Sequence, residues 1–90
     1  MNFIFSQHAL QQMFKRGISI ALVKRAISEG ETIKVYADDK PFPSKLNLLS
    51  EGDLNLHVVY AEDSVNKSYI IITAYYPDPA IWDKGFKIKK

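Results

Sequence analysis

Ninety residues, a formal net charge of +2 and the absence of cysteine bound what this chain can be. The length suits one domain around a single core, and a hydrophobic fraction of 47% excludes disorder throughout. The lack of cysteine excludes a disulfide framework and a thiolate zinc site, and it fits the reducing cytoplasm in which we expect the protein to act. The small positive charge permits a nucleic-acid partner without requiring one.

The sequence gives no sign of targeting to a membrane. Its first ten residues, MNFIFSQHAL, lack the basic segment and long apolar run of a signal peptide, so we expect none. No stretch approaches the roughly 20 apolar residues that a membrane span needs. We therefore expect no membrane partner.

Two short helices are predicted near the start of the chain, over Gln7–Arg16 and Ile20–Glu29. Each follows a serine suited to cap a helix and precedes a glycine suited to end one. Their apolar sides are predicted to be buried; they consist of Ala9, Leu10, Met13 and Phe14 in the first helix and of Ile20, Leu22, Val23, Ala26 and Ile27 in the second. The apolar segment Met1–Phe5 before them could form an edge strand or a packed arm.

After Gly30 the hydrophobic period changes from 3.6 to 2, which is typical of strands. Alternation and turn residues predict four of them: Glu31–Ala37, Ser44–Ser50, Leu54–Glu62 and Tyr69–Tyr76. The last, YIIITAYY, is apolar on both faces and is expected inside the sheet. The predicted fold is α+β, with both helices on one face of a four-stranded antiparallel sheet. Residues 1–90 are expected to form one domain, with a core over about 3–80 and a basic tail over 81–90. Trp82 and Phe86 could dock this tail, and its final KIKK is expected to be mobile.

Alternation divides the side chains of this sheet between two faces. The helices are expected to cover Ile33, Val35, Leu46, Leu48, Leu54, Leu56, Val58, Ile70 and Ile72. The other face then carries Lys34, Tyr36, Lys45, Asn47, Asn55, His57, Thr73 and Tyr75. Lysines, hydroxyls, amides and rings suit phosphates and bases, so this face is a candidate RNA-binding surface; its expected contacts are Lys34, Lys45, Asn47 and Thr73. An ordinary water-facing sheet has the same composition.

A second candidate lies on the first helix. His8, Gln12 and Arg16 are spaced four residues apart and so lie along one border of that helix. An imidazole and a guanidinium on one ridge can exchange a proton and hold a phosphate. The alternative is a surface histidine near the helix start and an arginine that pairs with a carboxylate.

Metal and cofactor motifs are not found. The two histidines, His8 and His57, lie on different predicted elements without ligand spacing, so we predict no metal site. No glycine-rich phosphate loop occurs, and we predict no cofactor.

Six motifs occur together along the chain: F-S-Q-H-A-L-Q-Q-M at Phe5–Met13, K-R-G-I-S at Lys15–Ser19, V-x-x-A-I at Val23–Ile27, G-E-x-I at Gly30–Ile33, L-H-V-V at Leu56–Val59 and I-I-T-A-Y-Y-P-D at Ile71–Asp78. Together they resemble a small bacterial family known as domain of unknown function 4258. The resemblance covers about residues 3 to 80. Paired helices before an antiparallel sheet are also similar to the layout of the RelE, BrnT and barnase-like group of small toxin ribonucleases.

By that analogy the resemblance implies cleavage of RNA without a metal. Its implied catalytic residues are His8, Arg16, His57 and Tyr75, and its implied partners are RNA and an antitoxin protein. The alternative is a non-catalytic protein interaction module or a homodimer. Apolar residues near the end of the chain favour that alternative; they are Tyr75, Tyr76, Ile81, Trp82 and Phe86.

Overall fold

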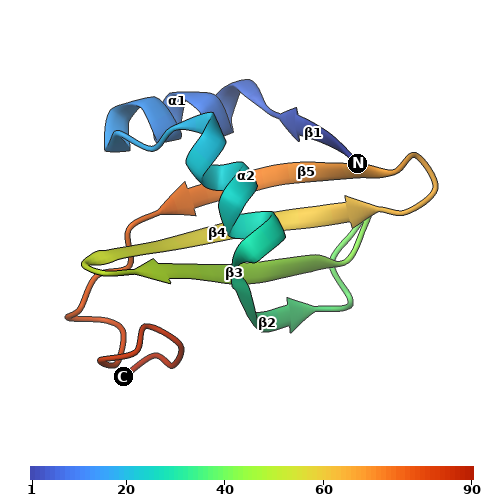
Figure 1. The fold of residues 1–90 in the computed structure, drawn as a ribbon. Coiled ribbons are helices and arrows are strands. Elements are labelled where there is room, and N and C mark those ends of the chain that lie inside the picture. Colours follow the sequence, from blue (N-terminus) through green and yellow to red (C-terminus); the bar gives the residue numbers. More distant parts are fainter.

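Two helices pack on one face of a five-stranded sheet in the computed structural model, which describes residues 1–90 (Figure 1). The elements are β1 (Asn2–Phe5), α1 (Gln7–Arg16), α2 (Ile20–Glu29), β2 (Glu31–Tyr36), β3 (Ser44–Glu51), β4 (Leu54–Asp63) and β5 (Ser68–Tyr75). Their order across the sheet is β1-β5-β4-β3-β2. The α+β class and both helix ranges are confirmed. Neither helix combines the length and apolarity needed to cross a bilayer.

The prediction of four antiparallel strands is wrong because β1 adds a fifth. It pairs with β5 in parallel, with Asn2 opposite Ser68 and Phe5 opposite Ile71, whereas the other pairs are antiparallel. Only Ser6 separates β1 from α1, so the outer edge of β5 beyond Ile71 has no strand beside it. α1 packs along β5 instead, as Figure 1 shows.

The ends of the helices follow the predicted chemistry. The serine before each helix accepts a hydrogen bond from a backbone N–H of the first turn. Gly17 ends α1 with a left-handed φ of 68°. Gly30 has an ordinary φ of −74°, but a Cβ there would overlap the carbonyl oxygen of Ala26 and lie 2.9 Å from that of Leu48. Glycine is thus needed at position 17 for its conformation and at position 30 for close approach to β3.

The main core lies between the helices and the sheet. Its buried residues are Ala9, Met13, Ile18, Val23, Ala26, Ile27, Leu49, Leu56, Val58, Tyr60, Ile71 and Ala74. The predicted apolar stripe of α1 is only half covered, because Leu10 is 40% exposed and Phe14 is 87% exposed.

β3 faces the opposite way from the prediction. Asn47 pairs with Val58 on the helix side, is 1% exposed and donates from Nδ2 to the carbonyl of Ala26 at 3.0 Å. Leu46 and Leu48 lie on the far face. Because β3 carries leucines on both faces, its alternation could not decide which of them faces the helices.

The reversal of β3 moves two predicted RNA contacts to the helix side of the sheet. Asn47 is bonded to the last turn of α2. Lys45 lies near the edge of the same face and forms an ion pair with Glu62 at 3.8 Å. Neither side chain belongs to the far face on which it was expected.

Two register shifts also break the predicted alternation. One lies between Thr32 and Lys34 in β2, and the other separates Val59 from Tyr60, where β4 pairs with β5. Ile72 is the extra residue of β5 and is 43% exposed, whereas Ile71 is buried in the core. The expectation that Ile70 and Ile72 face the helices is therefore wrong, since Ile70 pairs with Ala61 on the far face.

The segment after β5 folds back over the far face of the sheet. The ring of Trp82 is 7% exposed and stands edge-on to His57, with centroids 4.5 Å apart. The N–H of Asp83 donates to Ile88 and that of Lys90 donates to Ile81, both at 2.8 Å, so the tail closes on itself and its last residues are held in place. This second layer buries part of the face that was expected to be open.

Replacing Asn47 by alanine should lower the free energy of unfolding by about 2–4 kcal/mol. The change removes the donor to two carbonyls at the end of α2 and the acceptor for the hydroxyls of Thr32 and Tyr60. Asn55→Ala is the control, because Asn55 is a half-buried strand asparagine that accepts one hydrogen bond; it should cost less than about 1 kcal/mol. Urea denaturation measures both. Equal, small effects would contradict the buried position of Asn47.

Candidate functional site

One side of α1 meets the outer edge of β5 through three side chains. Nη1 of Arg16 donates to the carbonyl of Ala74 at 2.8 Å and to Oε1 of Gln12 at 2.9 Å. Oγ1 of Thr73 donates to the same Gln12 oxygen at 3.1 Å. The structure thus joins two predicted site residues, Arg16 and Thr73, through Gln12. We call Gln12, Arg16 and Thr73 the edge cluster.

The edge cluster keeps free donors beside its internal bonds. Arg16 is exposed, and a guanidinium has five N–H donors, of which the two recorded bonds use only those on Nη1. Gln12 accepts both of its bonds at Oε1, which fixes the amide orientation and leaves its two N–H groups available. Oriented donors of this kind suit phosphate oxygens.

His8 lies on the same ridge of α1. It precedes Gln12 by four residues, about 6 Å along the helix axis, and its side chain is exposed. An imidazole can accept a proton from one group and pass it to another. His8, Gln12 and Arg16 therefore present a proton carrier and phosphate donors along one line.

His57 has a different environment on the far face of the sheet. It is 0% exposed, and its Nε2 lies 2.8 Å from the carbonyl oxygen of Phe86 while its Nδ1 lies 3.2 Å from the hydroxyl of Tyr75. A carbonyl only accepts, so Nε2 carries the proton and Nδ1 accepts from Tyr75 when the ring is neutral. Burial lowers the pKa of His57 and raises that of Tyr75. The predicted catalytic residues His57 and Tyr75 are brought together, but the tail covers the imidazole.

A crevice of about 270 Å³ lies between the far face and the tail. We call it the tail pocket; its lining residues are Ile33, Lys34, Tyr36, Leu46, Tyr75, Trp82, Lys87, Ile88 and Lys89. The lining contains three lysines, three aromatic rings and no acidic residue. Such cations and rings match the phosphates and bases of a single-stranded nucleic acid.

The lysines of the tail pocket lie against its rings. Nζ of Lys34 is 5.3 Å from the ring centroid of Tyr36, and Nζ of Lys89 is 5.7 Å from that of Trp82. Lys87 forms an ion pair with Glu31 at 3.0 Å. Lys34 and Tyr75 were predicted for this face, whereas the tail lysines were missed; the cluster of lysines at the end of the sequence was their only signal.

No group of three or more His, Asp or Glu side chains is placed to hold a metal ion. The donors that converge in this protein are N–H and O–H groups together with cations. Cations and rings of the tail pocket suit an anionic, aromatic ligand, and His8 lies on the ridge of α1 that continues through the edge cluster.

Comparison with protein families matches residues 5–76 to Domain of unknown function (DUF4258). The match spans most of the chain and ends just after β5, so the chain belongs to this family. No curated protein and no solved structure matches it.

The stability of the fold should depend on the protonation of His57. Its folded-state pKa is lowered from 6.5, so the unfolded chain binds the proton more readily. The stability that neutral, buried His57 contributes to the fold is complete above pH 6.5 and is lost as the pH falls from there through the folded-state pKa. Thermal unfolding, followed by the fluorescence of Trp82, should show a lower midpoint at pH 5.5 than at pH 7.5.

His57→Gln is the matched variant for this pH dependence, because it keeps a polar side chain and removes the titrating ring. The difference between its midpoints at the two pH values should be smaller than in the parent protein. An identical pH dependence in both proteins would contradict the role given to His57.

Proposed function

We propose that this DUF4258 domain is a small endoribonuclease of the toxin type, with its reaction centre along the His8–Arg16 ridge of α1. What supports the proposal is the meeting of that ridge with Thr73 at the edge of β5. A guanidinium with free donors, an oriented amide and an exposed imidazole lie along about 12 Å of the helix axis.

Each group on the ridge has a place in RNA cleavage. His8 takes the proton of a ribose 2′-hydroxyl, and the 2′-oxygen attacks the adjacent phosphorus. The bond from phosphorus to the 5′-oxygen breaks, and that oxygen receives a proton from the imidazolium or from water. The products are a 2′,3′-cyclic phosphate and a 5′-hydroxyl. The free N–H groups of Arg16 and Gln12 stabilise the charge that develops on the phosphate oxygens.

The tail pocket provides the binding track for the rest of the RNA. Thr73 and Tyr75 lie on the same face of β5, about 7 Å apart along the strand. Thr73 belongs to the edge cluster and Tyr75 lines the tail pocket, so the two sites are neighbours. Bases stack on the tyrosine rings, and Lys34 and Lys89 bind phosphates.

A relationship to RelE, BrnT and barnase-like ribonucleases, and an antitoxin protein that holds the enzyme inactive, are further parts of what we propose. A layout alone does not establish an activity. The proposal therefore depends on the side chains of the ridge and can be tested on them.

His8→Ala and Arg16→Ala should each lower the cleavage rate about 100-fold or more, because each removes a proton carrier or a phosphate donor. Gln11→Ala is the matched control, since Gln11 is exposed on the same helix and lies off the ridge. Single-turnover cleavage of end-labelled unstructured RNA measures the rate, and the new 3′ ends should be cyclic phosphates. Absence of cleavage by the parent protein, or full cleavage by His8→Ala, would contradict the proposal.

Lys34→Ala should weaken RNA binding about fivefold to tenfold while leaving the single-turnover rate at saturating protein within about twofold, because it removes a phosphate contact away from the reacting bond. Lys24→Ala is the control, since Lys24 lies on the helix layer. Fluorescence anisotropy with a 2′-O-methyl RNA measures the affinity. Equal affinities for the two variants would argue against the tail pocket as the RNA track.

A further inference from the structure

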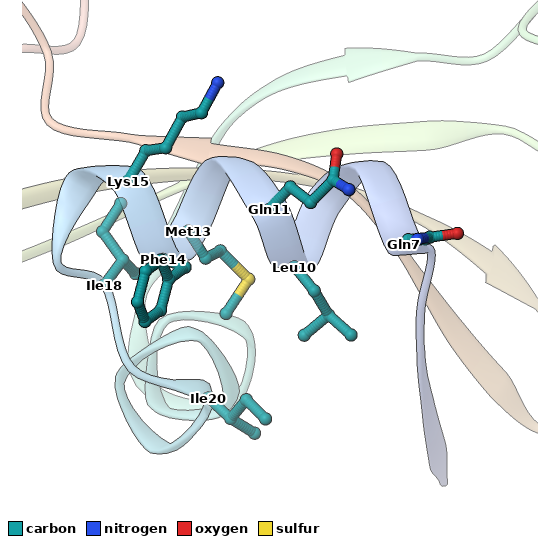
Figure 2. A pocket seen from close by; sticks show the side chains of 8 residues that line it. All are labelled: Gln7, Leu10, Gln11, Met13, Phe14, Lys15, Ile18 and Ile20. Atoms are coloured by element: carbon teal, nitrogen blue, oxygen red, sulfur yellow. The ribbon is translucent and has the colours of Figure 1, made fainter.

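The outer surface of the helix layer carries an apolar groove between α1 and the start of α2. Its volume is about 750 Å³, and its apolar lining consists of Leu10, Met13, Phe14, Ile18 and Ile20. Figure 2 shows Leu10, Met13 and Phe14 on the side of α1 that faces Ile20. We call this feature the helix groove. Phe14 is 87% exposed, Ile20 47% and Leu10 40%, so three large apolar side chains meet water in one place.

The helix groove is unusual for a surface that only faces water. Full burial of one such side chain stabilises a fold by about 1.5–3 kcal/mol. Leu10, Phe14 and Ile20 are only partly buried, so the folded chain does not gain all of this free energy from them. The β4–β5 turn exposes one comparable side chain, Val65, without apolar companions beside it in the sequence. Exposed apolar side chains gathered in one place are typical of interaction sites.

The charged residues among the first 28 positions, which form most of the helix layer, are all basic. Residues 1–28 contain four Lys or Arg and no Asp or Glu, so all ten acidic residues of the chain follow position 28. Arg25 is paired with Glu29 and Glu51. Lys15 lines the groove, and Figure 2 shows its side chain extending away from Leu10 and Phe14. Nζ of Lys24 lies 5.1 Å from the ring centroid of Phe3. Neither lysine takes part in an ion pair. An acidic partner would complement this surface.

A second copy of the chain fits this surface poorly. Symmetric pairing presents the same patch from both copies, and Lys15 is the one charged residue in the groove lining, so the lysine of one copy would find no carboxylate in the groove of the other. A partner bound in the helix groove would leave the edge cluster uncovered. Leu10 and Phe14 are about 200° around α1 from Gln12, so the groove and the ridge lie on opposite sides of the helix.

We propose that the helix groove binds an amphipathic helix of a partner protein, with an apolar stripe flanked by acidic residues. The stripe fills the groove beside Phe14, and the acidic flanks meet Lys15 and Lys24. This inference stands independently of RNA cleavage, because it uses a different side of α1.

Two labelled, stapled 16-residue helical peptides test the proposal. Both carry leucines at positions i, i+3, i+4, i+7 and i+11; one has glutamates at the flanking positions and the other has lysines. The acidic peptide should bind with a Kd of about 50 μM or lower in anisotropy titrations, and at least about tenfold more tightly than the basic one. Amide NMR shifts should change around the helix groove.

Phe14→Ser and Val65→Ser are matched variants, because both parent side chains are 87% exposed and neither supports the core. Phe14→Ser should weaken binding of the acidic peptide at least about tenfold, and Val65→Ser should leave it unchanged. Three results would each overturn the proposal: no binding of the acidic peptide at 1 mM, equal binding of both peptides, or equal affinity in both variants. Self-association of the free protein through Phe14, detected by light scattering, would also overturn it in favour of a second copy.

Discussion

The outer edge of β5 is covered by a strand along its first half and by a helix along its second. β1 is only four residues long, and after Ser6 the chain continues as α1 beside the same edge. Arg16 then supplies a donor to the Ala74 carbonyl, which no strand reaches. This contact orients α1 about its own axis. The His8–Arg16 ridge consequently faces the edge of the sheet, and the other side of the helix, with Leu10 and Phe14, faces outward.

The far face of the sheet is shaped by a segment that follows the family domain. Residues 77–90 lie beyond the matched range, and they cover His57 and bury Trp82. Both nitrogens of the His57 imidazole are bonded, so the ring links the sheet to the tail and is sheltered from solvent. What stays accessible on that side is the lysine-rich and aromatic tail pocket.

Local signals in the sequence were sufficient for the helices and for the ridge. Serine caps and glycine ends are decided by neighbours within four residues, and the ridge follows from the four-residue steps between His8, Gln12 and Arg16. Thr73, which contacts the ridge through Gln12, was predicted as an RNA contact but not as a neighbour of the ridge. Its position beside Gln12 depends on the parallel pairing of β1, which joins segments more than sixty residues apart.

Alternation failed where both faces of a strand are apolar or where a strand gains a residue. β3 has leucines on each side, and the apolar second layer that buries Leu46 comes from the tail, whose position no local pattern encodes. The extra residue at Ile72 exchanges the faces of Ile71 and Ile72, which a strict period of two cannot reproduce. Such features are set by contacts between distant segments.

The central claim is that the edge of β5 and the ridge of α1 bind an RNA phosphate. Its most direct measurement is an NMR titration with a non-cleavable 2′-O-methyl RNA, following the Nε–H of Arg16, the side-chain amide of Gln12 and the backbone amides of 73–75. The account predicts saturable shifts at all of these groups. Shifts restricted to the helix groove, or none at all, would contradict it.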